Sequence, residues 1–585
     1  MNRVKKINVA LATLLFMAGV TSDLMAQGSD LGNIQLDVIR AFEGQVQQAR
    51  KLNDIPKIQD TLRSEVELDY RIKPRSVFTD FTPNPLAPAR IRRVHADKLP
   101  KLMVRFGAGN YLTPLAEVSF NSERSRNQSW GVQARHFSTQ SGVSNVHYAE
   151  RQGLNNVNFL SENKLGGHYR RFFNTYTLST QAEGFYYANN YYGVPSLPND
   201  FNNTLDYGDV ERQHYLGTKA SVSLMSQKSK HDRIFDEARV GYHYLTDRFG
   251  SDEHFVAIPT KWSFPVDDYL AKIDFNTHIQ SAQADSNALN AQYANFHIFP
   301  HIEYLKDNMS FVLGGHIIYN HNEVMYRNEE VDVQNFYVFP QLTGRLKVVP
   351  NVIEFYGGVD YDFRMQNTAD LTREIPWLNP GILVQPTRKI DGFAGVDFLI
   401  MPGLNLDIKG QYMDWRNRPL VYRDPLFFQQ TNSLQGLDLL YVTGNELSLS
   451  GSLQYQYSDD LRFGARLAYS RYEFEDGAIP YHLAPWRGGI NTTYNFRKKI
   501  VFKTELVYIG QREAFNPNNF ANDQFPEDFH ILSPFWDVDF QVDYYFNNNL
   551  TAFIKIHNML AYRYDMYLGY GAQRFLAMAG FSFRL

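Results

Sequence analysis

The chain has 585 residues with 58 basic and 62 acidic side chains, which gives a formal net charge of −4. This balance argues against a nucleic-acid-binding protein, because such proteins carry a strongly basic surface. The sequence has no cysteine, which excludes a disulfide framework and a lipid-bearing cysteine. Aromatic residues make up 15% of the chain, a content that fits strands with one apolar face.

The first 26 residues have the order of a secretory signal peptide. Arg3, Lys5 and Lys6 form a basic start, residues 7–20 are largely apolar, and Ala26 supplies a small residue at the expected cut. The apolar run is short of the ~20 residues that a membrane-spanning helix needs, and an uncleaved anchor is the alternative. No later apolar run approaches ~18 residues, so no transmembrane helix is predicted.

Residues 27–100 lack any strand periodicity. Five prolines stand in the last part of this segment, at Pro74, Pro83, Pro85, Pro88 and Pro100. Such a run excludes a central strand or a regular helix and favours extended chain. Two interpretations stay open: a periplasmic lead-in, or an extended segment in the lumen of the barrel predicted next.

From residue 101 to the C-terminus, apolar and polar residues alternate with period two. Residues 536–546 show it most clearly, because the even-numbered positions are apolar and most odd-numbered ones are acidic or amide. A soluble sandwich also alternates, since its apolar faces meet in a core. However, many segments run about 12–16 residues, beyond the ~5–6 typical of soluble strands. Short turns also alternate with long polar loops, which favours an all-β transmembrane antiparallel barrel.

We predict about 22 strands, in a range of 16–22 because residues 228–290 have the weakest pattern. Closure is required, because every backbone polar group in lipid needs a partner. An even number places both barrel ends in the periplasm. The predicted strands are 101–110, 113–122, 128–141, 156–170, 175–190, 210–226, 236–248, 252–265, 268–282, 291–306, 309–322, 335–349, 352–366, 389–400, 404–416, 441–457, 461–474, 483–496, 500–512, 535–546, 550–562 and 573–585.

Three parts of the sequence resemble known outer-membrane proteins. The last residues, with Gly580, Phe583 and Leu585, resemble the terminal-strand signal read by the outer-membrane barrel assembly machinery. FGAGNYLTPLAEVSFNSERSRNQSWGVQARHFSTQSG (106–142) resembles the first hairpin of TonB-dependent-receptor-like barrels of Bacteroidetes. LTAFIKIHNMLAYRYDMYLGYGAQRFLAMAGFSFRL (550–585) resembles the closing hairpin of TonB-dependent receptors, where Asn-Leu-hydrophobic-Asn-Lys-Lys-Tyr precedes the last strand. Here that stretch reads Asn-Met-Leu-Ala-Tyr-Arg-Tyr, residues 558–564.

The resemblance implies an outer-membrane transporter or channel of a Gram-negative bacterium that takes up or passes a solute. In that family an inner-membrane TonB-type motor contacts an N-terminal box. Here residues 34–39 are the weak candidate for the box, and no full plug domain is found. The alternative is a structural or docking subunit of an outer-membrane assembly for secretion, export or barrel insertion. Expected partners are outer-membrane lipids, the assembly machinery, and a TonB-type motor or other envelope proteins, with no nucleic acid.

Charged side chains recur at strand positions that face away from lipid. They either tune which solutes pass, as charged rings do in pores, or are solvated and paired wall residues that contribute little individually. These lumen-facing candidates are Asp537, Asp539, Asp543, Glu354, Asp360, Asp362, Arg364, Arg462, Arg466, Lys503 and Glu505.

Three histidines are the candidates for a metal site. A two-residue turn at 307–308 would pair Phe299 with His316 and make His297 and His301 its diagonal neighbours, which can reach a shared ion. Imidazole suits zinc, copper or nickel. Because this rests on a guessed register, we predict no metal and no other cofactor. No zincin helix, phosphate loop or nucleophile elbow is present, so we predict no catalytic residue and no enzyme.

Overall fold

The computed structural model describes residues 100–123, 125–142, 157–193, 212–227, 234–285, 288–422, 436–515 and 529–585. The predicted signal peptide (1–26) and nearly all of the predicted N-terminal segment (27–100) lie outside the described residues.

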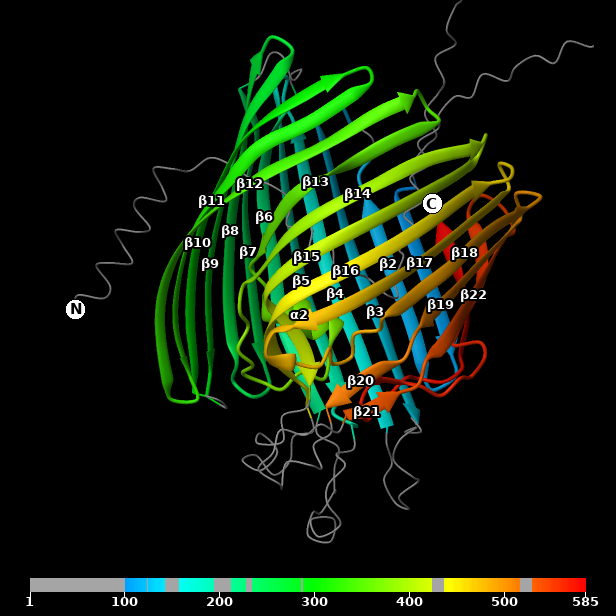
Figure 1. Cartoon of the computed structure of the whole chain (residues 1–585). Helices are drawn as coiled ribbons and strands as arrows, with labels where there is room; N and C mark the ends of the chain where they lie inside the picture. The colour runs from blue at the N-terminus through cyan, green and yellow to red at the C-terminus, as the bar shows by residue number, and fades with distance from the viewer. Residues whose placement is uncertain are drawn as a thin grey trace, which may run out of the picture. The chain divides into compact units, whose positions relative to one another are not determined.

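The described residues form one closed antiparallel sheet of 22 strands (Figure 1). In chain order they are β1 (Leu102–Gly109), β2 (Thr113–Asn121), β3 (Gln128–Gly142), β4 (Val157–Phe172), β5 (Tyr176–Asn190), β6 (Arg212–Ser226), β7 (Phe235–Asp247), β8 (Asp252–Val266), β9 (Tyr269–Ala284), β10 (Leu289–Lys306), β11 (Met309–Tyr326), β12 (Glu329–Val349), β13 (Ile353–Arg364), β14 (Thr387–Met401), β15 (Leu404–Tyr422), β16 (Asp438–Gln456), β17 (Leu461–Phe474), β18 (Trp486–Phe496), β19 (Ile500–Ile509), β22 (Phe535–Tyr545), β23 (Leu550–His557) and β26 (Leu576–Arg584).

Short elements lie between these strands. Two small hairpins are formed by β20 (Arg512–Phe515) with β21 (Phe529–Leu532), and by β24 (Asp565–Tyr567) with β25 (Tyr570–Gly571). The helix α2 (Thr368–Glu374) follows β13, and the 3-10 turn η1 (Glu475–Gly477) follows β17. No helix in the described part of the chain is long and apolar enough to span a membrane.

The barrel closes between its first and last strands. β26 pairs with β1 over the register from Met103↔Arg584 to Gly109↔Met578. Beyond β26, the Leu585 N–H donates to the Leu102 carbonyl at 2.8 Å. Closure leaves no sheet edge between first and last strands, which is what a membrane requires. The predicted fold and the count of 22 strands are confirmed.

The two faces of the wall differ as the alternation predicts. On β22, Trp536 is 48% exposed on the outer face, whereas Asp543 is 5% exposed on the inner face. Around the barrel, the exposed large apolar side chains lie at the alternate strand positions that face outward, including Phe583 in β26. Hydrocarbon therefore contacts one face of the closed sheet and the lumen the other.

The two ends of the barrel also differ. The turn end carries the start of β1, the C-terminal Leu585 and short connections such as residues 307–308. The longest connections all lie at the opposite end, here called the loop end. In Figure 1 the C-terminus lies toward the top, while β20 and β21 mark the loop end at the bottom.

The strand prediction was wrong for the ends of β11 and β12. It ended one strand at 322 and began the next at 335, but the pairing runs without a break to Tyr326↔Glu329. The turn residues Arg327 and Asn328 have φ of 51° and 66°, as a tight two-residue hairpin needs. Residues 329–332 are mostly acidic, which resembles a loop, but at a solvated barrel rim polar strands are stable.

Closure can be tested at Gly580, where β26 meets β1. A Cβ at Gly580 would lie within 2.6 Å of Gly107 Cα and closer still to the Phe106 carbonyl oxygen. We expect Gly580→Ala to destabilise the barrel by about 1–3 kcal/mol, the usual result of overpacking. Urea unfolding of the refolded protein in vesicles, followed by heat-dependent gel mobility, measures this.

The matched control is Gly184→Ala in β5, because a Cβ there meets nothing within 4 Å. Equal midpoints for the two variants would contradict the tight β1–β26 contact.

Candidate functional site

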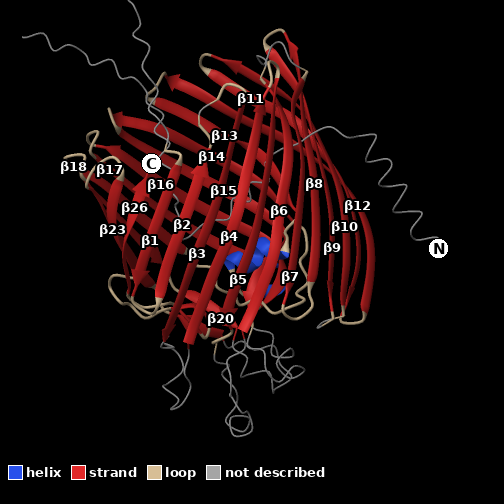
Figure 2. Ribbon diagram, turned by 180° about the vertical axis from the view of Figure 1, so that it is seen from behind, coloured by secondary structure: helices blue, strands red, loops and turns tan. Residues whose placement is uncertain are grey.

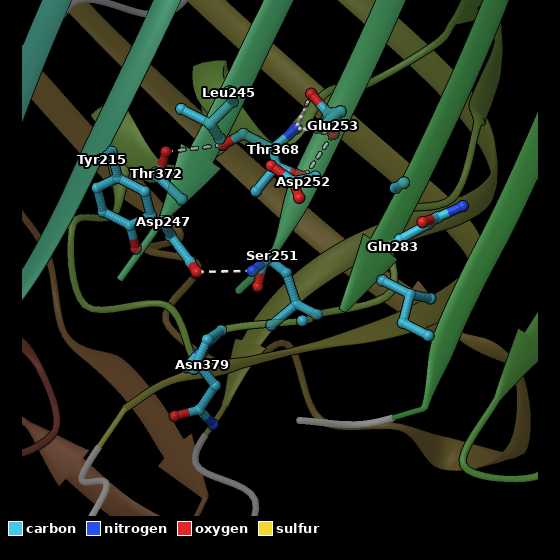
Figure 3. A pocket seen from close by; sticks show the side chains of 15 residues that line it. Tyr215, Leu245, Asp247, Ser251, Asp252, Glu253, Gln283, Thr368, Thr372 and Asn379 are labelled. Carbon is cyan, nitrogen blue, oxygen red and sulfur yellow. Dashed lines mark hydrogen bonds between the residues drawn. The ribbon is translucent and has the colours of Figure 1, made fainter. Parts of the chain in front are cut away.

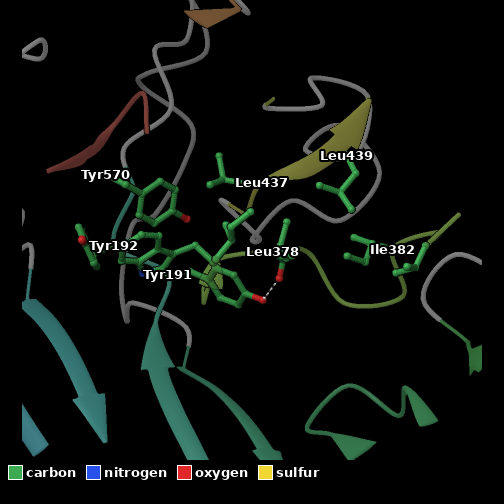
Figure 4. Packing of buried hydrophobic residues seen from close by; sticks show 10 residues of the cluster. Tyr191, Tyr192, Leu378, Ile382, Leu437, Leu439 and Tyr570 are labelled. Atoms are coloured by element: carbon green, nitrogen blue, oxygen red, sulfur yellow. Dashed lines mark hydrogen bonds between the residues drawn. The ribbon is translucent and has the colours of Figure 1, made fainter. Parts of the chain in front are cut away.

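The opening at the loop end is covered by segments that fold into the barrel. Residues 365–386, together with parts of the neighbouring connections and the start of β16, bury a common apolar cluster (Figure 4). We call this structure the loop-end cap. Its buried members are Tyr191, Tyr192, Ile375, Trp377, Leu378, Ile382, Val384, Leu437, Leu439 and Tyr570.

Aromatic stacking and hydroxyl hydrogen bonds hold the cap together. Trp377 stacks on Tyr570 with ring centroids 4.7 Å apart. The Tyr191 hydroxyl donates to the Leu378 carbonyl at 2.6 Å, and the Tyr192 hydroxyl donates to the Gly571 carbonyl at 2.9 Å. Leu378 and Tyr570 have no exposed surface. The cap therefore has a packed interior, and the largely apolar residues 375–384 are a sequence signal for it.

The helix α2 in the cap begins at a local capping signal. The Asn367 side chain accepts from the Asp370 N–H at 2.9 Å, and its amide donates to the Asp370 carboxylate at 2.8 Å. The first bond caps the N-terminus of the helix, and the second holds the two side chains together. This stretch is predicted above as a connection between strands, and the spacing Asn-x-x-Asp is the signal that indicates the helix.

Two polar contacts fix α2 to the inner wall (Figure 3). Glu253 of β8 is 3% exposed and accepts from the Thr368 N–H at 2.8 Å and from the Thr368 hydroxyl at 2.5 Å. The Gln280 amide donates to the same carboxylate at 3.1 Å. Lys219 of β6 pairs with Asp370 at 2.7 Å. Figure 2 shows α2 enclosed by the strands, nearer the loop end.

The Asp370 carboxyl is kept ionised by its surroundings. Burial by itself would raise the pKa of Asp370, but the Lys219 ammonium and the Asn367 amide hold the pKa below its ordinary value. The charged pair is therefore the resting form, and α2 presents a charged contact to the wall rather than a neutral one.

A cavity of about 490 Å³ lies between α2 and the wall strands β2 to β8. Its charged lining is mainly basic, because only Glu183 and Asp370 oppose a larger set of cations. The basic side chains are Arg170, Lys219, Arg239 and Arg373. Such a cluster raises the local concentration of anions. These residues are not among the predicted site residues, although those in strands lie at alternate positions that face the lumen.

The predicted acids of β22 each contact a neighbour. Asp537 accepts from the Tyr564 hydroxyl at 2.7 Å, Asp539 lies 2.7 Å from His557 Nδ1, and Asp543 lies 3.4 Å from Lys503 Nζ. Glu505 stands directly opposite Asp539.

The remaining predicted charges lie on β13 and β17. Glu354 pairs with Arg345 at 2.8 Å, and Asp362 with Arg364 at 3.1 Å. The Asp360 carboxylate accepts from the Tyr361 N–H at 2.8 Å. Arg462 and Arg466 stand opposite Gln456 and Ser452 of β16. None of the predicted charges lines the cavity beside α2.

The histidines have the register expected from the two-residue turn, but they do not converge. His297 Nε2 lies 2.8 Å from His316 Nδ1, and the other ring nitrogen of His316 lies 2.6 Å from the Gln341 side-chain oxygen. The Phe299 ring stacks on His316 at 4.1 Å and on His301 at 4.2 Å, so it separates these two imidazoles. Among the described residues, no three His, Asp or Glu side chains are grouped as metal ligands.

No protein-family model and no curated protein matches the sequence. Solved structures match the fold across 84% of the chain. The FrpB iron transporter of Neisseria meningitidis (F3-3 variant) is 9% identical, with a TM-score of 0.60 and 82% of its length covered. The ferric enterobactin receptor PfeA of Pseudomonas aeruginosa is 11% identical, with a TM-score of 0.60 and 81% covered.

The ferric-catecholate import receptor Fiu of E. coli K12 is 10% identical, with a TM-score of 0.60 and 83% covered. All three are TonB-dependent receptors and transport proteins. At these identities the likeness is one of fold. The described chain therefore has the 22-stranded barrel fold of TonB-dependent receptors.

Proposed function

We propose that this protein is an outer-membrane transporter or channel that passes a polar, negatively charged solute through its lumen. The observation that carries this proposal is the docking of α2 over a basic cavity by Glu253 and Lys219. A barrel of this size leaves a wide interior that must be filled or gated. The loop-end cap fills it at one end.

The contacts of α2 would allow it to separate from the wall. The cap interior is apolar and stays together, whereas α2 meets the wall partly through charged and hydrogen-bonded groups. Only Ala369 of α2 joins the wall cluster of Phe185, Tyr215 and Leu245. Water and an incoming anion can replace the polar contacts, so Lys219 is the group for which a solute would compete with Asp370.

The same proposal orients the protein. Short turns and both barrel ends lie on the periplasmic side, as in bacterial barrels with an even strand number. Gly580, Phe583 and Leu585 serve as the signal for the barrel assembly machinery, and a TonB-type motor acts from the turn end. The predicted wall charges Asp537, Asp539, Asp543, Lys503 and Glu505 then line the solute path.

Loss of the Glu253 carboxylate should open the cap. Glu253→Ala leaves the Thr368 and Gln280 donors without their acceptor, which costs about 1–3 kcal/mol and raises the undocked population about tenfold or more. We expect a matching rise in ion conductance in planar bilayers, with anions favoured over cations. Lys219→Met should raise total conductance and reduce the anion preference.

The control is Glu446→Ala in β16. Glu446 is a buried wall carboxylate, 4% exposed, that accepts from Arg418 and Trp415. It should leave conductance unchanged. A barrel that stays sealed in every variant and co-purifies with other envelope proteins would favour the structural or docking subunit instead.

Undocking of α2 can be measured without any solute. The Arg373–Glu374 bond lies in α2, and it should be protected from trypsin while the helix is docked. We expect Glu253→Ala to speed cleavage after Arg373 about tenfold, in line with the free energy above. Mass spectrometry of timed digests identifies the bond. Equal rates in the wild type, Glu253→Ala and Glu446→Ala would mean that Glu253 does not hold the cap.

A further inference from the structure

The barrel wall has a seam between β12 and β13. Their register runs from Val349↔Ile353 to Leu342↔Val359 and ends there. β12 continues to Glu329, paired throughout with β11 on its other side. Within the described residues, the β12 edge from Gln341 to Glu329 has no backbone register with β13.

Sequence explains why the ladder stops at this point. The Lys347 N–H donates to the Asn308 carbonyl on the β11 side, so odd-numbered groups of β12 face β11 and even-numbered ones face β13. The next β13-facing position after Leu342 is Pro340, which has no N–H to donate.

β13 turns away at the same level. Gly358 has φ of 152°, and a Cβ there would lie within 2.6 Å of Thr343 Cα. Only glycine adopts this conformation readily. A missing donor on one strand and a glycine bend on the other therefore end the pairing together.

Beyond this point β13 lies against the inner surface of β12 and its neighbours. Tyr361 stacks on Phe339 of β12 with centroids 4.2 Å apart, and Arg388 of β14 lies 4.3 Å from the Tyr337 ring centroid. Met365, just after β13, packs in the cluster of Phe255 and Tyr293 on β8 and β10. The wall overlaps itself here and is held by side-chain stacking. Each aromatic pair contributes only about 0.5–1.5 kcal/mol beyond its burial.

Apolar side chains lie on both sides of the seam. On the outer face, Phe336 is 67% exposed and Val338 is 59% exposed. The inner face of this sector carries the aromatic rings Phe299, Tyr337 and Phe339, beside the polar side chains of His316 and Gln341. The inner wall beside α2 is instead mainly basic. Aromatic rings therefore lie between the lumen and the place where the β12–β13 ladder ends.

The unpaired edge needs a polar partner. The N–H and C=O groups of Phe336 and Val338 point toward the side from which β13 has departed. Peptide groups left bare in hydrocarbon cost several kcal/mol each. A molecule with an apolar body and one polar group can contact both the aromatic rings and the edge.

We propose that the β12–β13 seam is a lateral portal through which an amphipathic solute with an aromatic or aliphatic body passes between the lumen and the hydrocarbon layer. Its body slides between Phe339 and Tyr361, and its polar group pairs with the edge peptides of Phe336 and Val338. The portal depends on the proposed membrane location, but not on passage of a polar solute through the loop-end cap.

The test uses the full chain expressed in the outer membrane of a Gram-negative host. The probe is N-phenyl-1-naphthylamine, an aromatic amine that fluoresces in hydrocarbon. Since the chain has no cysteine, Phe339→Cys with Tyr361→Cys introduces the only thiols and can lock the seam. Pro340→Val restores a backbone donor where the ladder stops, and Phe339→Ala removes half of the stack.

We expect probe entry at least fivefold above the host without the chain. The oxidised double-cysteine variant and Pro340→Val should return it to the host rate, reductant should restore it in the former, and Phe339→Ala should raise it. The matched control is Ser448→Cys with Ser470→Cys, a directly opposed pair with hydroxyls 3.1 Å apart in a continuous ladder. Its disulfide should change nothing.

Entry at the host rate for the wild type, or entry unaffected by both the lock and Pro340→Val, would overturn the portal. A seam lock that releases a co-purifying protein without slowing probe entry would also overturn it and assign the edge to strand addition by that protein. Ion conductance measured on the same variants shows separately whether the loop-end cap opens. Failure of the portal is thereby distinguished from failure of the proposed transport function.

Discussion

The requirement that every backbone polar group in a membrane find a partner within the protein governs this structure. A chain made of strands meets it by closing the sheet, and here the Leu585 N–H bonds to the Leu102 carbonyl beside the β1–β26 ladder. Closure at Gly580 demands a residue without a Cβ, because the two backbones approach closely there. The alternating faces follow, since hydrocarbon and lumen then lie on opposite sides of one sheet.

Closure creates a second constraint, because a wide lumen must be filled or gated. The loop-end cap meets it with an apolar interior around Leu378 and Tyr570 and a more polar boundary with the wall at Glu253 and Lys219. The contacts inside the cap are therefore mainly apolar, whereas those between α2 and the wall are more polar. Because the cap interior includes Leu439 of β16, α2 is the part that we propose to separate from the wall.

The β12–β13 seam is an exception to the rule that every backbone polar group is paired. Its place in the chain also connects it with the cap. Tyr361 at the seam and Asn367 at the start of α2 belong to one continuous segment that leaves β13. Met365 between them packs on the inner wall. Displacement of α2 would therefore pull on the strand whose side chains close the seam, so the two proposed openings share a mechanical element.

The sequence by itself determined the barrel. Strand pairing repeats locally, so alternation in segments such as residues 536–546 predicted the faces, the closure and the 22 strands. A tight turn likewise fixed the register that sets His316 opposite Phe299 and beside His297. Only the tertiary structure decided the α2 docking, the basic cavity and the overlap of Tyr361 on Phe339. These depend on residues from strands far apart in sequence meeting in space, which no local period encodes.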